Sequence, residues 1–247
     1  MKFRNIWSVA SKDLESIRGR RSIVYGIIFL PLLLAVTFSV FVGNEAEQSI
    51  QSGVPLTQMG LGLDSIIYFF VILAAILPGS IAAYSIVGEK VERSLEPLLA
   101  TPMSDREILL GKSIAAFLPP ILATWAGATI FMAASDYITT TKLSFYYFPD
   151  WISGVMLFVV APLAAIFSVE LTVIVSSRVS DVRGATQIAS LMFIPFMGVF
   201  FAEVNGDITF SVGNLLVFSA ILLIIDLVLF SVSTSTFRRE EILTRWK

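Results

Sequence analysis

Six long apolar stretches limit what this chain can fold into. They cover residues 22–44, 65–88, 113–135, 151–177, 184–202 and 208–237. Each is long enough to cross a bilayer as a helix, which needs about 20 apolar residues. With 56% hydrophobic and 15% charged residues, the chain carries more apolar surface than a soluble domain can bury. The sequence therefore predicts an all-α, polytopic membrane protein with six transmembrane helices, forming a single domain over residues 1–247.

Positive charge is distributed unevenly between the polar segments. The N-terminal arm 1–21, the segment 88–112, the turn 178–183 and the tail 238–247 hold 16 of the 17 lysines and arginines, and the other connections hold Lys142 alone. Lysine and arginine concentrate in cytoplasmic loops. We therefore expect a multi-pass protein of the plasma (cytoplasmic) membrane with both termini and the 88–112 segment in the cytoplasm.

The composition excludes most catalytic chemistry. The chain has neither cysteine nor histidine, so it lacks thiol chemistry, the commonest metal ligand and the usual general base. It also lacks the Gly-x-x-x-x-Gly-Lys-Ser/Thr loop that cradles nucleotide phosphates. We expect no catalytic residue, no cofactor and no metal on this chain, and no enzyme activity.

The N-terminal arm, residues 1–21, has the pattern of an amphipathic helix. Its apolar stripe at helical spacing consists of Phe3, Ile6, Trp7, Ala10, Leu14 and Ile17. The charged residues, expected largely away from the stripe, are Lys2, Lys12, Asp13, Glu15 and Arg18. Such a helix can lie in the membrane surface. It can equally act as a lever that docks a cytosolic partner, and the two interpretations are compatible.

The polar segment 88–112 is longer than the roughly 2–8 residues that a simple helical hairpin needs. Ser94 is a good N-cap, and Pro97 is tolerated in a first helical turn. Pro102 then ends the helix near Thr101. The run from Ser104 to Glu107 is a capping box, which predicts a new helix that continues into the third span.

The short helix predicted over 94–101 has an apolar side made of Leu95, Leu98 and Leu99. A charged collar precedes it, comprising Glu89, Lys90, Glu92 and Arg93. An apolar knob held by rigid flanks can dock into a groove on a soluble partner. It can also fold back onto the chain's own membrane surface, and the spacing does not decide between the two.

Two acids, Glu170 and Asp226, interrupt apolar stretches. A carboxylate in mid-membrane costs about 2.5–3.5 kcal/mol on insertion scales, so it tends to be protonated, partnered or turned inward. No lysine or arginine lies at matching depth, and the candidate partners are Ser168, Thr172, Ser176, Ser231, Ser233 and Thr234. The acids form either a cation or proton site on a translocation path, or neutral groups hydrogen-bonded between helices.

The run GEKVERSLEPLLATPMSDREILLGK at 88–112 resembles the signature of the type-2 family of ATP-binding-cassette (ABC) permeases. The runs VELTVIVSSRVSDVRGATQI and RREEILTRWK, and the plan of an amphipathic arm with six spans, are similar to the same family. The resemblance implies a coupling helix between spans two and three, docked in a groove of a separate ATP-binding subunit. The residues that match this element are Glu89, Glu92, Ser94, Leu95, Glu96, Pro97, Leu98, Leu99 and Thr101.

The family further implies a permease subunit of an ATP-driven exporter. Two permease copies, as a homodimer or a heterodimer, would form the path in the lipid bilayer, and two ATP-binding subunits would carry ATP and Mg. We expect no nucleic-acid partner. The alternative is a gradient-driven secondary transporter or channel that uses Glu170 and Asp226. A membrane scaffold that does not transport is a further alternative.

Overall fold

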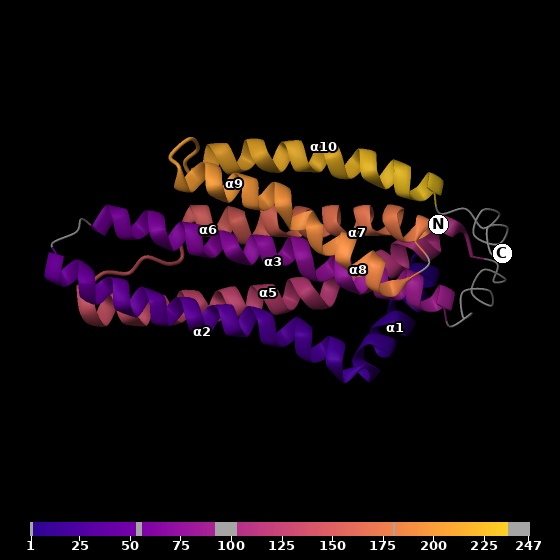
Figure 1. Cartoon of the computed structure of the whole chain (residues 1–247), viewed down its shortest axis with the longest axis horizontal. Helices are drawn as coiled ribbons and strands as arrows, with labels where there is room; N and C mark the ends of the chain where they lie inside the picture. Colours follow the sequence, from indigo (N-terminus) through magenta and orange to yellow (C-terminus); the bar gives the residue numbers. More distant parts are fainter. Residues whose placement is uncertain (1, 53–55, 92–102, 180, 237–247) are drawn as a thin grey trace.

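The computed structural model describes residues 2–52, 56–91, 103–179 and 181–236, and these residues form helices and connections without a strand. Figure 1 shows them as a long bundle. The elements are α1 (Phe3–Gly19), α2 (Arg21–Ser52), α3 (Leu56–Val91), α5 (Asp105–Leu143), α6 (Trp151–Val155), a π-helical segment (Met156–Val160), α7 (Ala161–Arg178), α8 (Val182–Ser190), a 3₁₀ turn (Leu191–Phe193), α9 (Ile194–Val204) and α10 (Val212–Thr236).

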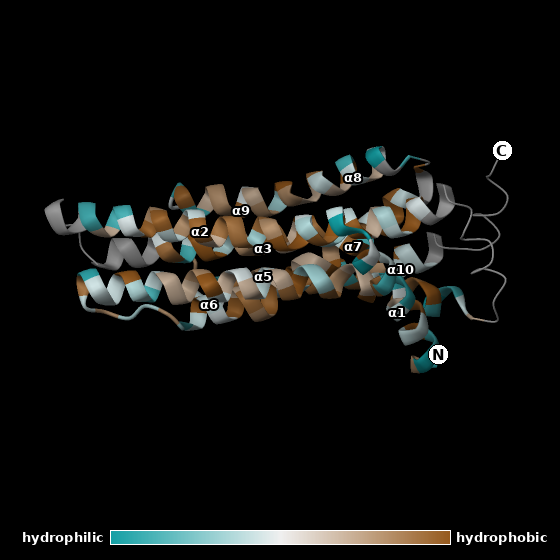
Figure 2. Cartoon of the chain, turned by 90° about the horizontal axis from the view of Figure 1, so that it is seen from below, coloured by the Kyte–Doolittle hydropathy of each residue, from teal (hydrophilic) through white to brown (hydrophobic). Residues whose placement is uncertain are grey.

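Six helical segments of the described chain are long and apolar enough to cross a membrane, which confirms the predicted all-α, polytopic class. They are Arg21–Gln48, Gly62–Gly88, Asp105–Leu143, Trp151–Ser176, Arg183–Val204 and Val212–Thr234. In Figure 2 hydrophobic residues fill the middle of the bundle, and hydrophilic residues gather toward its two ends. This banding is what a hydrocarbon layer about 30 Å thick requires.

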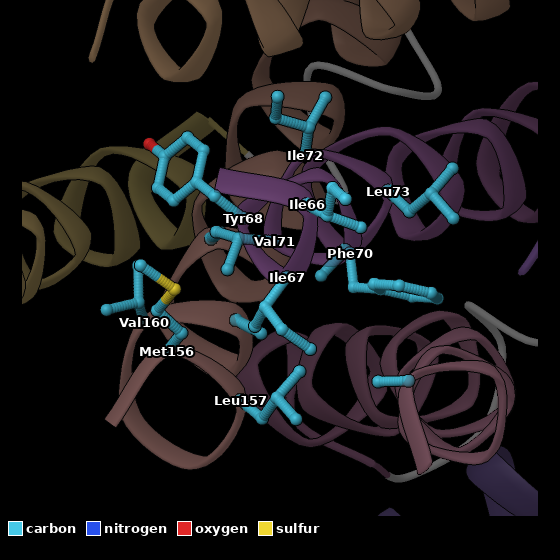
Figure 3. Packing of buried hydrophobic residues seen from close by; sticks show 14 of the residues in the cluster. Ile66, Ile67, Tyr68, Phe70, Val71, Ile72, Leu73, Met156, Leu157 and Val160 are labelled. Carbon is cyan, nitrogen blue, oxygen red and sulfur yellow. The ribbon is translucent and has the colours of Figure 1, made fainter. Parts of the chain in front are cut away.

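Helix α3 lies at the centre of the bundle. In its apolar stretch 78% of the residues are buried, against 17% in α2. Ile67, Phe70 and Val71 of α3 are fully buried in one cluster with Met156 and Leu157 of the π-helical segment (Figure 3). Because α3 also packs against α5, α7 and α8, it is the element around which the other spans are arranged.

Several helices continue past the apolar stretches that predicted them. Helix α2 extends to Ser52 and α5 to Leu143, so both helices continue into the connections expected between the apolar stretches. Lys142 connects these two extensions, since its Nζ donates to Glu47 Oε1 at 2.5 Å and to the Gly43 carbonyl at 3.1 Å. Hydropathy marks where a chain can meet lipid, whereas backbone hydrogen bonding decides where a helix ends.

The last span, predicted from residue 208, begins later as a helix. Ser211 Oγ accepts a hydrogen bond from the backbone N–H of Asn214 at 3.2 Å, and α10 begins at Val212. The apolar residue Ile208 belongs to the connection before it. A serine that caps the backbone therefore sets this start, and the hydropathy of the preceding residues does not.

The two ends of the bundle are built differently. Helix α1, the end of α3, the start of α5 and the end of α10 lie together at one end, called here the α1 end (Figure 1). At the opposite end, Asp136 Oδ1 accepts the backbone N–H groups of Tyr147 and Phe148 at 3.1 and 3.0 Å. Ser65 Oγ donates to Glu203 Oε2 at 2.9 Å, which joins α3 to α9. Burial, together with the nearby charge of Asp64, raises the pKa of the Tyr147 phenol.

Helices α5 and α2 approach each other closely at Gly127. A Cβ there would lie 2.7 Å from Pro31 Cβ and 2.9 Å from the Pro31 carbonyl oxygen. We expect Gly127→Ala to lower the free energy of unfolding by about 1–3 kcal/mol, because the backbone of α2 would have to move. Unfolding in mixed detergent micelles measures this.

Gly26→Ala in α2 is the matched control, because a Cβ at Gly26 would have no neighbour within 4 Å. We expect it to be neutral or to stabilise the chain by up to about 1 kcal/mol, since alanine is the better helix former. Equal losses from the two substitutions would contradict close packing at Gly127.

Candidate functional site

Helix α1 packs directly on the first turns of α5. A Cβ on Gly111 of α5 would lie 2.6 Å from Val9 Cβ and 2.8 Å from the Ile6 carbonyl oxygen. Only a residue without a side chain allows the two backbones to approach this closely. The N-terminal helix is therefore an integral part of the bundle.

The apolar stripe predicted for α1 divides into two surfaces. Ile6, Ala10 and Ile17 are buried, whereas Phe3 is 74% exposed and Trp7 is 47% exposed. The buried surface packs against the bundle. The exposed aromatic pair has the character of residues that lie at a membrane–water interface. One apolar surface of α1 is thus covered by the bundle, and the other is exposed.

Asp13 is buried, contrary to the prediction that it lies away from the apolar stripe. Its Oδ2 is 3.1 Å from Lys112 Nζ on α5 and accepts the Ser85 hydroxyl of α3 at 2.7 Å. Lys112 Nζ also donates to Ser85 Oγ at 3.2 Å. The side chains of Asp13 and Lys112 are only 6% and 2% exposed. Buried charges require a partner, so this contact fixes α1 against α3 and α5.

Glu107 joins the N-terminal ends of α1 and α5. The predicted capping box is confirmed: Ser104 Oγ accepts the Glu107 N–H at 3.3 Å, and Glu107 Oε2 accepts the Ser104 N–H at 3.1 Å. The same carboxylate also accepts the backbone N–H of Lys2 at 2.6 Å and the Asn5 side-chain amide at 3.2 Å. One carboxylate therefore accepts one backbone N–H at the start of each of two helices.

We call these two sets of contacts the clamp: Glu107 with Lys2 and Asn5, and Asp13 with Lys112 and Ser85. The sequence-based interpretation assigned Glu107 to its capping box only and gave no role to the ion pair. Helical spacing could have predicted the burial of Asp13. This residue lies three positions after Ala10 and four before Ile17, so it shares their face of the helix.

Most of the predicted coupling residues lie outside the described residues. These are Glu92, Ser94, Leu95, Glu96, Pro97, Leu98, Leu99 and Thr101. Glu89 falls in the last turn of α3, and its side chain is likewise outside the description. Both flanks of the segment are described, and both belong to the clamp: α3 contributes Ser85, and α5 contributes Glu107 and Lys112.

The two intramembrane acids are both buried, Glu170 on α7 and Asp226 on α10, and these two helices pack against each other. Glu170 is 7% exposed and Asp226 is 4% exposed. They are close enough for the charge of Asp226 to act on Glu170. Within the described chain, Glu170 Oε2 and both carboxylate oxygens of Asp226 have no hydrogen-bond partner. An inward position was one of the three outcomes that the sequence left open for each acid, but the sequence did not reveal that the helices carrying them would pack together.

Five of the six hydroxyl groups proposed as partners are directed elsewhere. On α10 they bond to carbonyls of their own helix: Ser231 to Leu227, Ser233 to Phe230 and Thr234 to Ser231. Ser168 Oγ and Thr172 Oγ1 of α7 lie against Gly79 of α3, where a Cβ would be 2.5 and 2.9 Å from them. These five hydroxyls therefore do not solvate the pair of acids.

We expect Lys112→Met to destabilise the chain by about 3–5 kcal/mol, because it leaves Asp13 buried without its counter-charge. The double substitution Asp13→Leu with Lys112→Met should recover most of the loss, since apolar replacements need no partner. Unfolding of the purified chain in mixed micelles measures both changes.

The matched control is Lys142→Met, which breaks the exposed ion pair with Glu47 at the opposite end of the bundle. We expect this substitution to have little effect, because exposed pairs contribute little to stability. A loss from Lys112→Met no larger than that from Lys142→Met would contradict the structural role of the buried pair.

The comparison with known families identifies the bundle. A family model described as "ABC-2 family transporter protein" matches residues 7–204, from within α1 to the end of α9. No curated protein matches the chain. The matched range covers the clamp residues Asp13, Ser85, Glu107 and Lys112, the segment 88–112 and five of the six spans. The chain therefore belongs to the ABC-2 transporter family and is a membrane permease.

Proposed function

We propose that the chain is the transmembrane subunit of an ATP-driven ABC exporter, which forms a translocation path as a dimer and is coupled to a separate ATP-binding subunit. Family membership supports the general class of transport permease. The clamp is the observation that carries the finer proposal. It ties together α1, α3 and α5 on both sides of the segment predicted to dock the ATP-binding subunit.

In the proposed cycle, ATP and Mg are bound by the partner subunit, which supplies the energy. Its closure pushes the docked helix at 94–101. Because α5 begins at Asp105, only a few residues after Thr101, the displacement reaches α5 first. The clamp then carries α1 along with α5, and the spans tilt. A displacement of this kind requires the partner to favour one arrangement energetically, since a ligand with equal affinity for both shifts nothing.

The proposal places both termini and the 88–112 segment in the cytoplasm and the spans in the plasma membrane. The concentration of lysine and arginine on these segments supports this orientation. Two copies of the ATP-binding subunit would serve two permeases, either identical or related. The exposed apolar side chains of α2, such as Phe29, Leu33 and Val36, leave surface for lipid or for the second permease.

Docking at the 88–112 segment is tested by co-purification with the ATP-binding subunit. We expect the tagged chain, extracted in mild detergent, to carry a soluble ATP-binding protein in equal amount. Glu92→Ala and Leu98→Asp should lower the bound amount at least about tenfold, as expected when central contacts of an interface are removed. Quantitative mass spectrometry of the purified complex measures the ratio.

Glu45→Ala and Ile208→Asp are the matched controls, because they make the same kinds of change at exposed positions of the opposite end. They should leave the ratio unchanged. A chain that purifies alone, or controls that lose as much partner as the insert variants, would contradict docking at this segment.

The buried pair Glu170 and Asp226 favours a second candidate, a gradient-driven transporter in which the two acids carry the coupled ion. Under the proposed function the acids are instead neutral packing groups, or a polar patch of the path. We expect Glu170→Gln with Asp226→Asn to retain ATP-dependent transport in vesicles, because amides keep the shape without the charge.

The transport rate in the same vesicles, measured with and without ion gradients, decides between the two candidate functions. Dissipating the proton and sodium gradients should leave the transport rate unchanged if ATP is the energy source. Loss of transport on gradient collapse, together with loss in the double amide variant, would favour the gradient-driven candidate.

A further inference from the structure

The fourth span, Trp151–Ser176, is interrupted by the π-helical segment between α6 and α7. In an α-helix each backbone N–H donates to the carbonyl four residues earlier. Here the N–H of Ala161 donates instead to the carbonyl of Met156, five residues earlier. One extra residue is therefore inserted into the helical path at this point. Single π-helical turns of this kind are rare, and they occur frequently at functional sites.

The extra residue separates the Leu157 carbonyl from the backbone donors nearest to it. Its α-helical partner would be the N–H of Ala161, which is bonded to Met156. The next residue, Pro162, has no N–H. Trp125 of α5 supplies a donor, since its indole Nε1 lies 2.7 Å from the Leu157 carbonyl oxygen. An indole from a neighbouring helix thus stabilises the π-helical hydrogen-bond register.

An α-helical register is a close alternative for the same residues. If Ala161 donated to Leu157, that carbonyl would be satisfied without Trp125. The Phe158 carbonyl would then need the N–H of residue 162, which proline lacks. Pro162 therefore leaves a carbonyl without its backbone donor in either register, so neither register is strongly favoured by the backbone alone. Passing from one to the other corresponds to a rotation of about 100° and a shift of about 1.5 Å along the helix axis.

The two sides of the π-helical segment are held unequally. On the α7 side, Ala164 and Ala165 are fully buried in the central cluster, and α7 packs along α3. Helix α6 lies toward the end of the bundle opposite α1 (Figure 1). Its buried residue is Ser153, whereas Trp151 is 84% exposed and a Cβ on Gly154 would have no neighbour within 4 Å. Helix α7 is thus anchored, and α6 is loosely packed.

We propose that the π-helical segment is a hinge in the fourth span, at which α6 changes register relative to α7, and that Trp125 holds the register seen in the structure. When the bond from Trp125 breaks, the Ala161 N–H returns to the Leu157 carbonyl and α6 rotates, while α7 stays on α3. Because α6 also packs on α10, the rotation changes the contact between these helices. Its use in opening a translocation path rests on the proposed function, whereas the hinge itself does not.

The test is an electron–electron distance measurement across the hinge in lipid bilayers. Spin labels at Trp151→Cys and Ile166→Cys occupy exposed positions on either side of it, and the chain has no native thiol. The otherwise native chain should give one narrow distance distribution. Trp125→Phe keeps an aromatic ring but removes the N–H donor, so a second population should appear. We expect it to be shifted by several Å, because a rotation of about 100° moves a side chain across most of the helix width.

Pro162→Ala tests whether the missing backbone donor is the cause. The new N–H can donate to the Phe158 carbonyl, which completes an α-helical register whose hydrogen-bond geometry is better than that of a π-helical turn. We expect the labels to move to the second distance in this variant. Adding Trp125→Phe should then change nothing further. An effect of Trp125→Phe as large in the Pro162→Ala background as in the native one would contradict the proposed register change.

Trp7→Phe is the matched control, because it makes the same change at an exposed indole of α1. It should leave the distance distribution unchanged. A single, unshifted distribution in Trp125→Phe would overturn the hinge even if the melting temperature falls, because the indole bond would then stabilise a fixed turn. A second population in Trp7→Phe would overturn it as well. None of these measurements needs ATP or a partner, so the hinge and the exporter can fail separately.

Discussion

The buried ion pair between Asp13 and Lys112 is the constraint on which the α1 end of the molecule depends. Two opposite charges that are almost fully removed from water stabilise a fold only while they remain together. One partner is on the N-terminal helix and the other is on the first turns of a transmembrane helix. The pair therefore determines that α1 is part of the bundle, and Ser85 extends the contact to the central helix α3.

Glu107 complements the ion pair at the start of the same two helices. The pair fixes the middle of α1, and the carboxylate of Glu107 fixes its beginning through Lys2 and Asn5. Between these points Gly111 allows direct backbone contact with α1. Two polar attachments and one close approach restrain sliding, rotation and separation. A force applied to the start of α5 is thus a force applied to α1.

The general plan of the fold was predictable from the sequence because each helix that crosses a bilayer needs about 20 apolar residues. Apolar stretches of the required length identified all six spans. The capping box at Ser104 and Glu107 was predictable because its hydrogen bonds are local. Helix ends within polar sequence, such as those of α2 and α5, were not predictable, because contacts like that of Lys142 with Glu47 join residues far apart in the chain.

The candidate site was also predictable only in part, because its contacts join residues that are far apart in the chain. Glu170 and Asp226 stood out because charge within an apolar stretch is rare. That the helices carrying them, α7 and α10, pack against each other is encoded by neither segment alone. Asp13 was assigned to the polar side by its residue type, although its position on the helical wheel placed it among buried residues. The coupling residues at 94–101 stay a prediction.

The central claim, that α1 and the start of α5 form one rigid unit, is tested most directly by an electron–electron distance measurement. The chain has no cysteine, so spin labels can be attached at Ser8→Cys and Arg106→Cys, both exposed positions, without removing native thiols. We predict a single narrow distance distribution in lipid bilayers that broadens when Lys112→Met breaks the ion pair. A broad distribution in the otherwise native chain, or a narrow one that Lys112→Met leaves unchanged, would contradict the account.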